Sequence, residues 1–148
     1  MSLFDKINTD IKQAMLNKEK EKLEALRSVK AAFLIAKTEK GNNELTSEKE
    51  ISVIQKLVKQ RKDSANVYIE NNRPELAEKE TKEAEFISVY LPKQMSEAEI
   101  VAELNTIISE LGASTMKDMG KVMGVATKKM AGKADGKIIS TKVKELLS

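Results

Sequence analysis

The residues of this chain whose types and spacing could do chemistry with a ligand lie in its last third, between Gly112 and Lys144. Five of the six glycines and eight lysines fall in this segment, which holds only two acidic residues, Asp118 and Asp135. Glycine lets another backbone or a ligand come close because it has no Cβ. A surplus of lysine attracts anions. The segment therefore predicts contact with a negatively charged partner.

The stretch from Gly132 to Lys137, with the sequence GKADGK, resembles a phosphate-binding loop only loosely. A Walker loop has four residues between its glycines, and Lys-Ser or Lys-Thr completes it. Here three residues separate the glycines and Ile138 follows Lys137, so ATP hydrolysis is not predicted. A helix–loop–helix turn with glycines in left-handed conformations explains the same residues, and it still presents backbone amides and two lysines to a phosphate.

Gly120 and Gly124 fall inside a segment with helical periodicity. Each interior glycine costs about 0.5–1 kcal/mol relative to alanine, and their spacing places both on one face. Either a sugar–phosphate backbone or a partner helix approaches this face, or a neighbouring helix of the same small unit packs tightly against it. A methionine stripe in the same segment is either an adaptable groove or, more commonly, core. Its members are Met116, Met119, Met123 and Met130.

A second concentration of positive charge lies earlier in the chain. The run Lys-Gln-Arg-Lys at 59–62 winds around a helix and forms no single stripe, so a solvated surface is preferred to a binding face. The members of this group are Arg27, Lys30, Lys56, Lys59, Arg61 and Lys62.

Catalysis by this chain alone is not predicted. The sequence has no histidine and no cysteine, which excludes histidine acid–base chemistry, thiol nucleophiles and zinc sites of the usual Cys/His kind. Glu99 and Glu103 have the spacing of exposed helix neighbours, and any lysine-rich helix offers a pair such as Ser140 and Lys144. We therefore assign no catalytic residue, no metal ligand and no cofactor.

The elements that must position these residues are helices. Only five of the 148 residues are aromatic, and Leu, Ile, Val, Met and Ala recur at three- and four-residue spacing. We expect an all-α fold. Ser47 with Glu50, and Ser96 with Glu99, have capping-box spacing, and Gly41 ends the second helix. The predicted helices cover about 3–17, about 20–39, a third that begins at Thr46 or Ser47 and is stopped by the cluster at 71–74, about 74–90, a fifth between the Ser96 cap and Gly112, and about 115–131, with a last one starting near Ser140.

Pro92 forbids continuation of the fourth helix. We therefore expect a four-helix N-terminal subdomain at 1–91, a linker at 92–95 and a three-helix C-terminal subdomain at 96–148. No apolar run approaches the roughly 20 residues of a membrane span, the first residues do not form a signal peptide, and the absence of cysteine suits a reduced compartment. A cytoplasmic location without membrane contact is expected.

Six stretches, in this order along nearly the whole chain, resemble a known family. They are LRSVKAA at 26–32, VKQRKDS at 58–64, ELAEKE at 75–80, YLPKQMSE at 90–97, KDMGKVMG at 117–124 and GKADGK at 132–137. Together they resemble the YqeY family, also called the GatB/YqeY domain.

The resemblance implies two helical subdomains and similarity to the C-terminal tail of the B subunit of the bacterial glutamyl-tRNA(Gln) amidotransferase. In that enzyme the tail helps to hold the tRNA. The kinase-like cradle and the separate glutaminase subunit have no counterpart in these 148 residues. The resemblance therefore implies tRNA binding and an association with tRNA-dependent amidation. Carbon–nitrogen ligase activity, with glutamine as amide donor, belongs to the larger enzyme.

The resulting hypothesis is a cytoplasmic module that binds structured tRNA by shape and phosphates. Amidotransferase or tRNA synthetase components are further partners that the resemblance implies. The alternative is a helical protein-interaction adaptor that binds no nucleic acid and receives a partner helix on the face of Gly120 and Gly124. For tRNA binding, the predicted phosphate contacts are Lys117, Lys121, Lys128, Lys129, Lys133 and Lys137, and close approach is assigned to Gly120, Gly124, Gly132 and Gly136.

Overall fold

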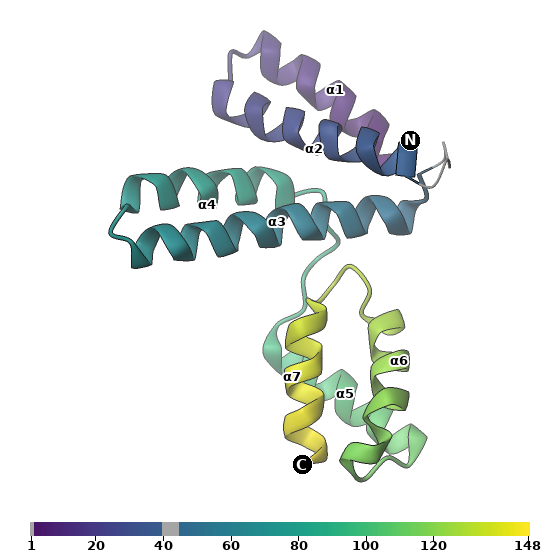
Figure 1. The fold of residues 1–148 in the computed structure, drawn as a ribbon. Helices are drawn as coiled ribbons and strands as arrows, with labels where there is room; N and C mark the ends of the chain where they lie inside the picture. The colour runs from purple at the N-terminus through teal and green to yellow at the C-terminus, as the bar shows by residue number, and fades with distance from the viewer. Residues whose placement is uncertain (1, 40–44) are drawn as a thin grey trace. The chain divides into compact units, whose positions relative to one another are not determined.

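The computed structural model describes residues 2–39 and 45–148, and this part of the chain forms seven α-helices, one short 3-10 helix and no strand (Figure 1). The expected all-α fold class is confirmed. Gly41, the predicted end of the second helix, lies outside the described residues. The α-helices are α1 (Leu3–Leu16), α2 (Lys20–Thr38), α3 (Ser47–Glu70), α4 (Pro74–Ser88), α5 (Glu97–Leu111), α6 (Met119–Lys129) and α7 (Gly136–Leu147), and the 3-10 helix η2 is Met116–Asp118.

Contacts within the chain divide it into two compact units, which we call unit 1 (Met1–Leu91) and unit 2 (Pro92–Ser148). The helices α1 to α4 lie in unit 1, and α5 to α7 lie in unit 2. All five aromatic residues of the sequence belong to unit 1. That the two units are separate subdomains stays a prediction.

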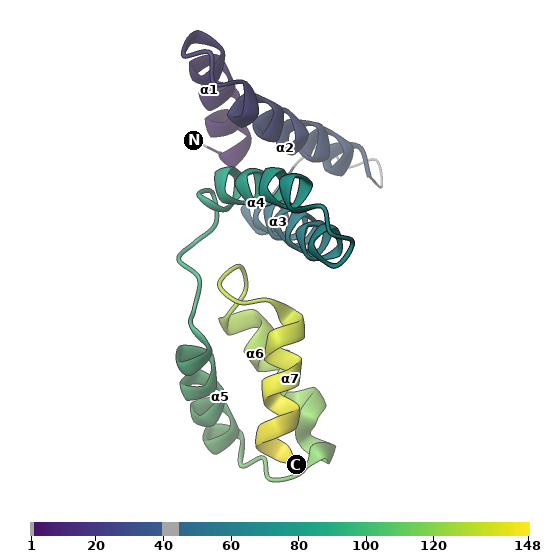
Figure 2. The same ribbon diagram turned by 90° about the vertical axis from the view of Figure 1, so that its left-hand side faces the viewer.

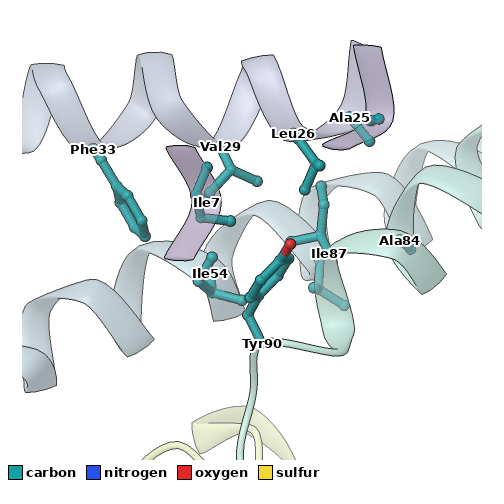
Figure 3. Packing of buried hydrophobic residues seen from close by; sticks show 11 residues of the cluster. Ile7, Ala25, Leu26, Val29, Phe33, Ile54, Ala84, Ile87 and Tyr90 are labelled. Atoms are coloured by element: carbon teal, nitrogen blue, oxygen red, sulfur yellow. The ribbon is translucent and has the colours of Figure 1, made fainter. Parts of the chain in front are cut away.

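Unit 1 consists of two helix pairs, α1 beside α2 and α3 beside α4, and α2 also packs on α3 and α4 (Figures 1 and 2). Apolar side chains from all four helices meet in one core, shown in Figure 3. The ring of the partly buried Phe4 packs against this core, with its centroid 6.2 Å from that of the buried Phe33 ring. The fully buried members of this core are Ile7, Leu26, Val29, Phe33, Ile54 and Ile87.

Glu50 does not cap its own helix, and the predicted capping box with Ser47 is wrong. The N-cap of α3 is Thr46, whose side chain accepts a hydrogen bond from the Lys49 amide at 3.1 Å. The Glu50 side chain is only 2% exposed and accepts a hydrogen bond from the Phe4 amide at 2.8 Å. Glu50 therefore caps the first turn of α1, where backbone amides have no partner within the helix.

Unit 2 arranges α5, α6 and α7 around its own core. The predicted capping box at the start of α5 is confirmed, because the Ser96 hydroxyl accepts from the Glu99 amide at 3.2 Å and the Glu99 carboxylate accepts from the Ser96 amide at 3.1 Å. Gly112 ends α5 in a left-handed conformation with φ of 65°. The buried residues of this core are Ile100, Leu104, Ile107, Val122, Ala126, Met130, Ala134, Ile139, Val143 and Leu147.

Candidate nucleic-acid interface

The helix predicted over 115–131 is divided into η2 and α6, and its methionine stripe is mainly core. Met130 is buried, while Met119 and Met123 are partly buried against the core of unit 2. Only Met116, in η2, is exposed. The stripe therefore holds α6 against its neighbours and leaves the opposite face of the helix to solvent.

Gly120 and Gly124 lie on this exposed face of α6. A Cβ built on either glycine meets no atom within 4 Å. Tight packing of a neighbouring helix, one of the two explanations that the sequence allowed, is therefore wrong for the described chain. Nothing within unit 2 requires a residue without a side chain at these two positions, although each lowers the stability of the helix.

Lys121 and Lys128 occupy the same side of α6 as the two glycines. They are seven residues apart, which is two turns or about 10 Å along the helix axis. Both side chains are exposed, and Gly124 lies between them on the surface. This face therefore presents two ammonium groups on either side of a stretch of bare backbone, and we call it the α6 glycine–lysine face.

Two of the eight lysines of the segment form ion pairs with carboxylates of unit 2. Lys129 lies 3.9 Å from Glu103 and 3.7 Å from Glu110 of α5. Lys142 lies 3.8 Å from Glu97 and 3.5 Å from Glu145. A phosphate at Lys129 would also face two carboxylates, so this predicted contact is disfavoured by charge.

The other predicted phosphate contacts are exposed and point away from the core. Within residues 92–148, all of which the structure describes, no carboxylate lies within the 4.0 Å of an ion pair from any of these five side chains. Backbone amides of Ser114 and then Thr115 lower the pKa of Asp118, and Lys121 adds a smaller effect. The five residues are Lys117, Lys121, Lys128, Lys133 and Lys137.

The loop from α6 to α7 is a helix–loop–helix turn. A carboxylate of the chain, and not a phosphate, accepts a hydrogen bond from a backbone amide at the start of α7. Asp135 is the N-cap of α7 and accepts a hydrogen bond from the Lys137 amide at 3.2 Å. The helix begins at Gly136, before the predicted start near Ser140, because of this cap. Gly136 is helical, whereas Gly132 is buried with φ of 78°. The backbone conformation of the loop thus accounts for Gly132 without any ligand.

Arg61, in the second basic group, is not part of a solvated surface. Its Nε lies 3.1 Å from Glu83 of α4, its Nη2 donates to the Ser28 hydroxyl at 2.8 Å, and its Nη1 donates to the Leu57 carbonyl at 3.2 Å. The Arg61 side chain is 14% exposed. Sequence reasoning missed this network, which joins α2, α3 and α4, because its partners lie far apart in the chain and give no local signal.

The other members of this group fit the predicted solvated surface. Arg27, Lys56, Lys59 and Lys62 are exposed, and Lys30 is partly buried.

Comparison with known proteins identifies the family. The family model of the Yqey-like proteins, YqeY, matches residues 4–147. The chain belongs to the YqeY family. The resemblance carried by the six sequence stretches is therefore confirmed.

Curated relatives of this YqeY-family chain are yeast proteins named "Altered inheritance of mitochondria protein 41, mitochondrial". The protein from Vanderwaltozyma polyspora is 29% identical over 76% of this chain and 64% of its own length. The one from Lachancea thermotolerans is 31% identical over 73% of this chain and 59% of its own length. The one from Saccharomyces cerevisiae strain YJM789 is 30% identical over 91% of this chain and 71% of its own length.

The YqeY-family chain thus spans less than two thirds of the length of the first two of these relatives. The names of the relatives place those proteins in mitochondria, and the cytoplasmic location of this chain stays a prediction. None of the helices in residues 2–39 and 45–148 has the length and apolar character needed to cross a membrane.

Proposed function

We propose that this YqeY-family chain is a cytoplasmic module that binds structured tRNA through unit 2. The observation that carries the proposal is the exposed pair Gly120 and Gly124, which has open space where a side chain would stand. Each glycine weakens α6 by up to about 1 kcal/mol, and no contact within the described chain offsets this loss. A sugar–phosphate backbone that lies against the bare helix would make use of the missing side chains.

The charges of unit 2 support a phosphate ligand. Lys121 and Lys128 lie on either side of Gly124, while Lys133 in the following loop and Lys137 in the first turn of α7 add further positive charge. Unit 2 contains no aromatic residue, so it has no ring on which an unpaired base could stack. Recognition then depends on the shape and the phosphates of a folded RNA.

The proposal also covers the division into subdomains and the reaction that the module assists. Units 1 and 2 act as separate four-helix and three-helix subdomains, joined at residues 92–95. The module assists tRNA-dependent amidation together with amidotransferase or tRNA synthetase components, by analogy with the tail of the larger enzyme. We assign the chemistry of that reaction to those components, because this chain has no histidine and no cysteine, and its described residues bring together no cluster of side chains that could hold a metal ion.

The test is a titration of labelled tRNA at several salt concentrations. Replacing four lysines of unit 2 by glutamate should lower the affinity, and the slope of log K against log salt should fall by about three. A control with four exposed lysines of unit 1 replaced by glutamate has the same change in net charge and should keep the slope. The test variant changes Lys121, Lys128, Lys133 and Lys137, and the control changes Lys12, Lys20, Lys59 and Lys79.

Lys129 stays unchanged in the test variant, because a glutamate at this position would repel Glu103 and Glu110 and could unfold unit 2. Binding of the wild-type chain weaker than about 10⁻⁴ M at low salt would remove the proposal.

A protein-interaction adaptor is the second candidate, because the open face of Gly120 and Gly124 and the exposed Met116 would also suit a partner helix. The four-lysine variant separates the two functions. Loss of tRNA binding with retained capture of a purified protein partner supports the RNA module. Capture of the partner without any tRNA binding by the wild type supports the adaptor, and its loss in the four-lysine variant would place the partner on the same lysines.

A further inference from the structure

The last two residues of the predicted linker at 92–95, Gln94 and Met95, are hydrogen-bonded to the loop between α6 and α7. The Gln94 side-chain amide donates one hydrogen bond to the Gly132 carbonyl at 2.7 Å and another to the Pro92 carbonyl at 2.8 Å. The Met95 amide donates to the Lys133 carbonyl at 2.9 Å. Gln94 and Met95 therefore tether this loop through two hydrogen bonds, and we call this pair of residues the strap.

The same loop is anchored from the inside by the core of unit 2. Met130 and Ala134 are buried in this core, and Met95 packs against it. Gly132 is buried as well, whereas Lys133 between these residues is exposed. Ala131 and Asp135 of this loop are exposed as well, and Asp135 is the N-cap of α7, so Lys133 is the one cationic side chain that the loop directs outward.

We propose that Gln94 is a positioning residue, which fixes the 131–135 loop so that Lys133 is preorganised to contact an RNA phosphate. The inference rests on the proposed function and deepens it. An ammonium group on an ordered backbone loses less conformational freedom on binding than one on a moving loop. Both hydrogens of the Gln94 amide are donated to carbonyl oxygens of the chain, so Gln94 has no N–H group left to offer a phosphate.

The chemistry of Gln94 matches this role. Its neighbours are two carbonyl oxygens, which accept hydrogen bonds but cannot donate them, so the position requires a group with two N–H donors. A glutamate of the same size has no such donor when ionised and would repel both carbonyls. Gln94→Glu should therefore release the loop at least as much as Gln94→Ala does.

Amide hydrogen exchange of the full chain tests the strap without any RNA. In Gln94→Ala, the Met95 and Lys133 amides should exchange up to about tenfold faster, because the side-chain hydrogen bond from Gln94 to the Gly132 carbonyl of the loop is lost. Gln60→Ala is the matched control, since Gln60 is exposed on α3 of unit 1, and it should leave these amides unchanged. Unchanged exchange in Gln94→Ala would overturn the inference, even if tRNA binds to the wild type.

Titration with tRNA tests what the strap is for. The dissociation constant of Gln94→Ala for tRNA should lie within about twofold of that of Lys133→Ala, and the slope of log K against log salt should fall by about one. In the Gln94→Ala/Lys133→Ala double variant, the second substitution should cause no further loss of affinity. Gln94→Ala should add its full effect to Lys121→Ala, since Lys121 lies outside the loop.

The outcomes of the two experiments can be told apart. Faster exchange with unchanged affinity would show that Gln94 has a structural role alone, and the inference would be wrong. No tRNA binding by the wild type would refute the proposed function and, with it, the role of Lys133 toward RNA, whatever the exchange shows.

Discussion

Replacing the two exposed glycines of α6 by alanine should make the protein more stable and should weaken its binding of tRNA. A Cβ at Gly120 or Gly124 meets no atom within 4 Å, so the new methyl groups have room. Both residues lie in α6, where alanine is the residue that favours helix most. The substitution therefore removes only the backbone freedom that glycine gives the unfolded chain.

The expected gain is about 1 kcal/mol for Gly124→Ala, in the middle of the helix, and less for Gly120→Ala, in its first turn. For a unit of this size, 1 kcal/mol raises the midpoint of thermal unfolding by about 4–8 °C. Far-ultraviolet circular dichroism is the suitable assay, because unit 2 has no aromatic residue to observe. Affinity for tRNA, measured on the same variants, should fall as the methyl groups fill the space that the backbone of the RNA would occupy.

Gly112→Ala is the matched control, because a Cβ at Gly112 also has open space around it. Its φ of 65° lies in the left-handed region, where a side chain costs about 1–2 kcal/mol. This variant should lose stability, although it is as uncrowded as the other two. A loss of stability in Gly124→Ala similar to that in Gly112→Ala would refute the inference that the α6 face is open.

Three more predictions concern buried or capping side chains. Arg61→Leu should lower the free energy of unfolding by about 2–3 kcal/mol, measured in urea, because it leaves the largely buried Glu83, whose side chain is 18% exposed, without its partner. Arg61→Leu/Glu83→Leu should recover part of this loss. Burial, and then the hydrogen bond and charge of Asp10, raise the pKa of Tyr90. The stability that the protonated Tyr90 gives to the folded state is present below its ordinary pKa of 10.0 and is lost as pH rises toward the higher pKa of the folded state. In Tyr90→Phe, the free energy of unfolding measured in urea should therefore decline less at alkaline pH. Hydrogen bonds from the backbone amide and then the hydroxyl of Ser96 lower the pKa of Glu99 from its ordinary value of 4.5. The stability that the ionised Glu99 gives to the folded state is therefore present above pH 4.5 and is lost as pH falls through the lower pKa of the folded state. Glu99→Gln, which keeps a cap without the charge, should reduce the acid sensitivity of unit 2 in circular dichroism.

Local signals were sufficient to predict most of the helices. Ser96 and Gly112 mark the two ends of α5, and each acts through residues within four positions along the chain. The start of α7 was predicted too late, because the glycine of Asp135-Gly136 was interpreted as part of a loop. The carboxylate of Asp135 caps the helix from the position just before it, and this cap outweighs the low helix propensity of the glycine.

Long-range partners could not be predicted in the same way. Glu50 has the spacing of a local cap, but its hydrogen bond goes to Phe4, 46 positions away. Arg61 lies in a run of basic residues, but its role is set by Glu83 and Ser28 on other helices. In both cases the sequence indicates the chemical group, and only tertiary packing selects its partner.

The candidate site shows the same division. Lysine and glycine content indicated an anion-contacting segment, but the sequence left open whether Gly120 and Gly124 face a neighbouring helix or solvent. That choice depends on the placement of α5 and α7 around α6, which no local pattern encodes. The pairing of Lys129 with two glutamates of α5 depends on the same placement.

The confinement of all aromatic residues to unit 1 has a spectroscopic consequence. The protein has no tryptophan, and both of its tyrosines, Tyr68 and Tyr90, belong to unit 1. Tyrosine emission therefore reports the unfolding of unit 1 alone, while far-ultraviolet circular dichroism follows the helices of both units. The unmodified protein thus carries a separate optical signal for unit 1. Different midpoints of thermal unfolding from tyrosine emission and from circular dichroism would reveal two subdomains that melt independently.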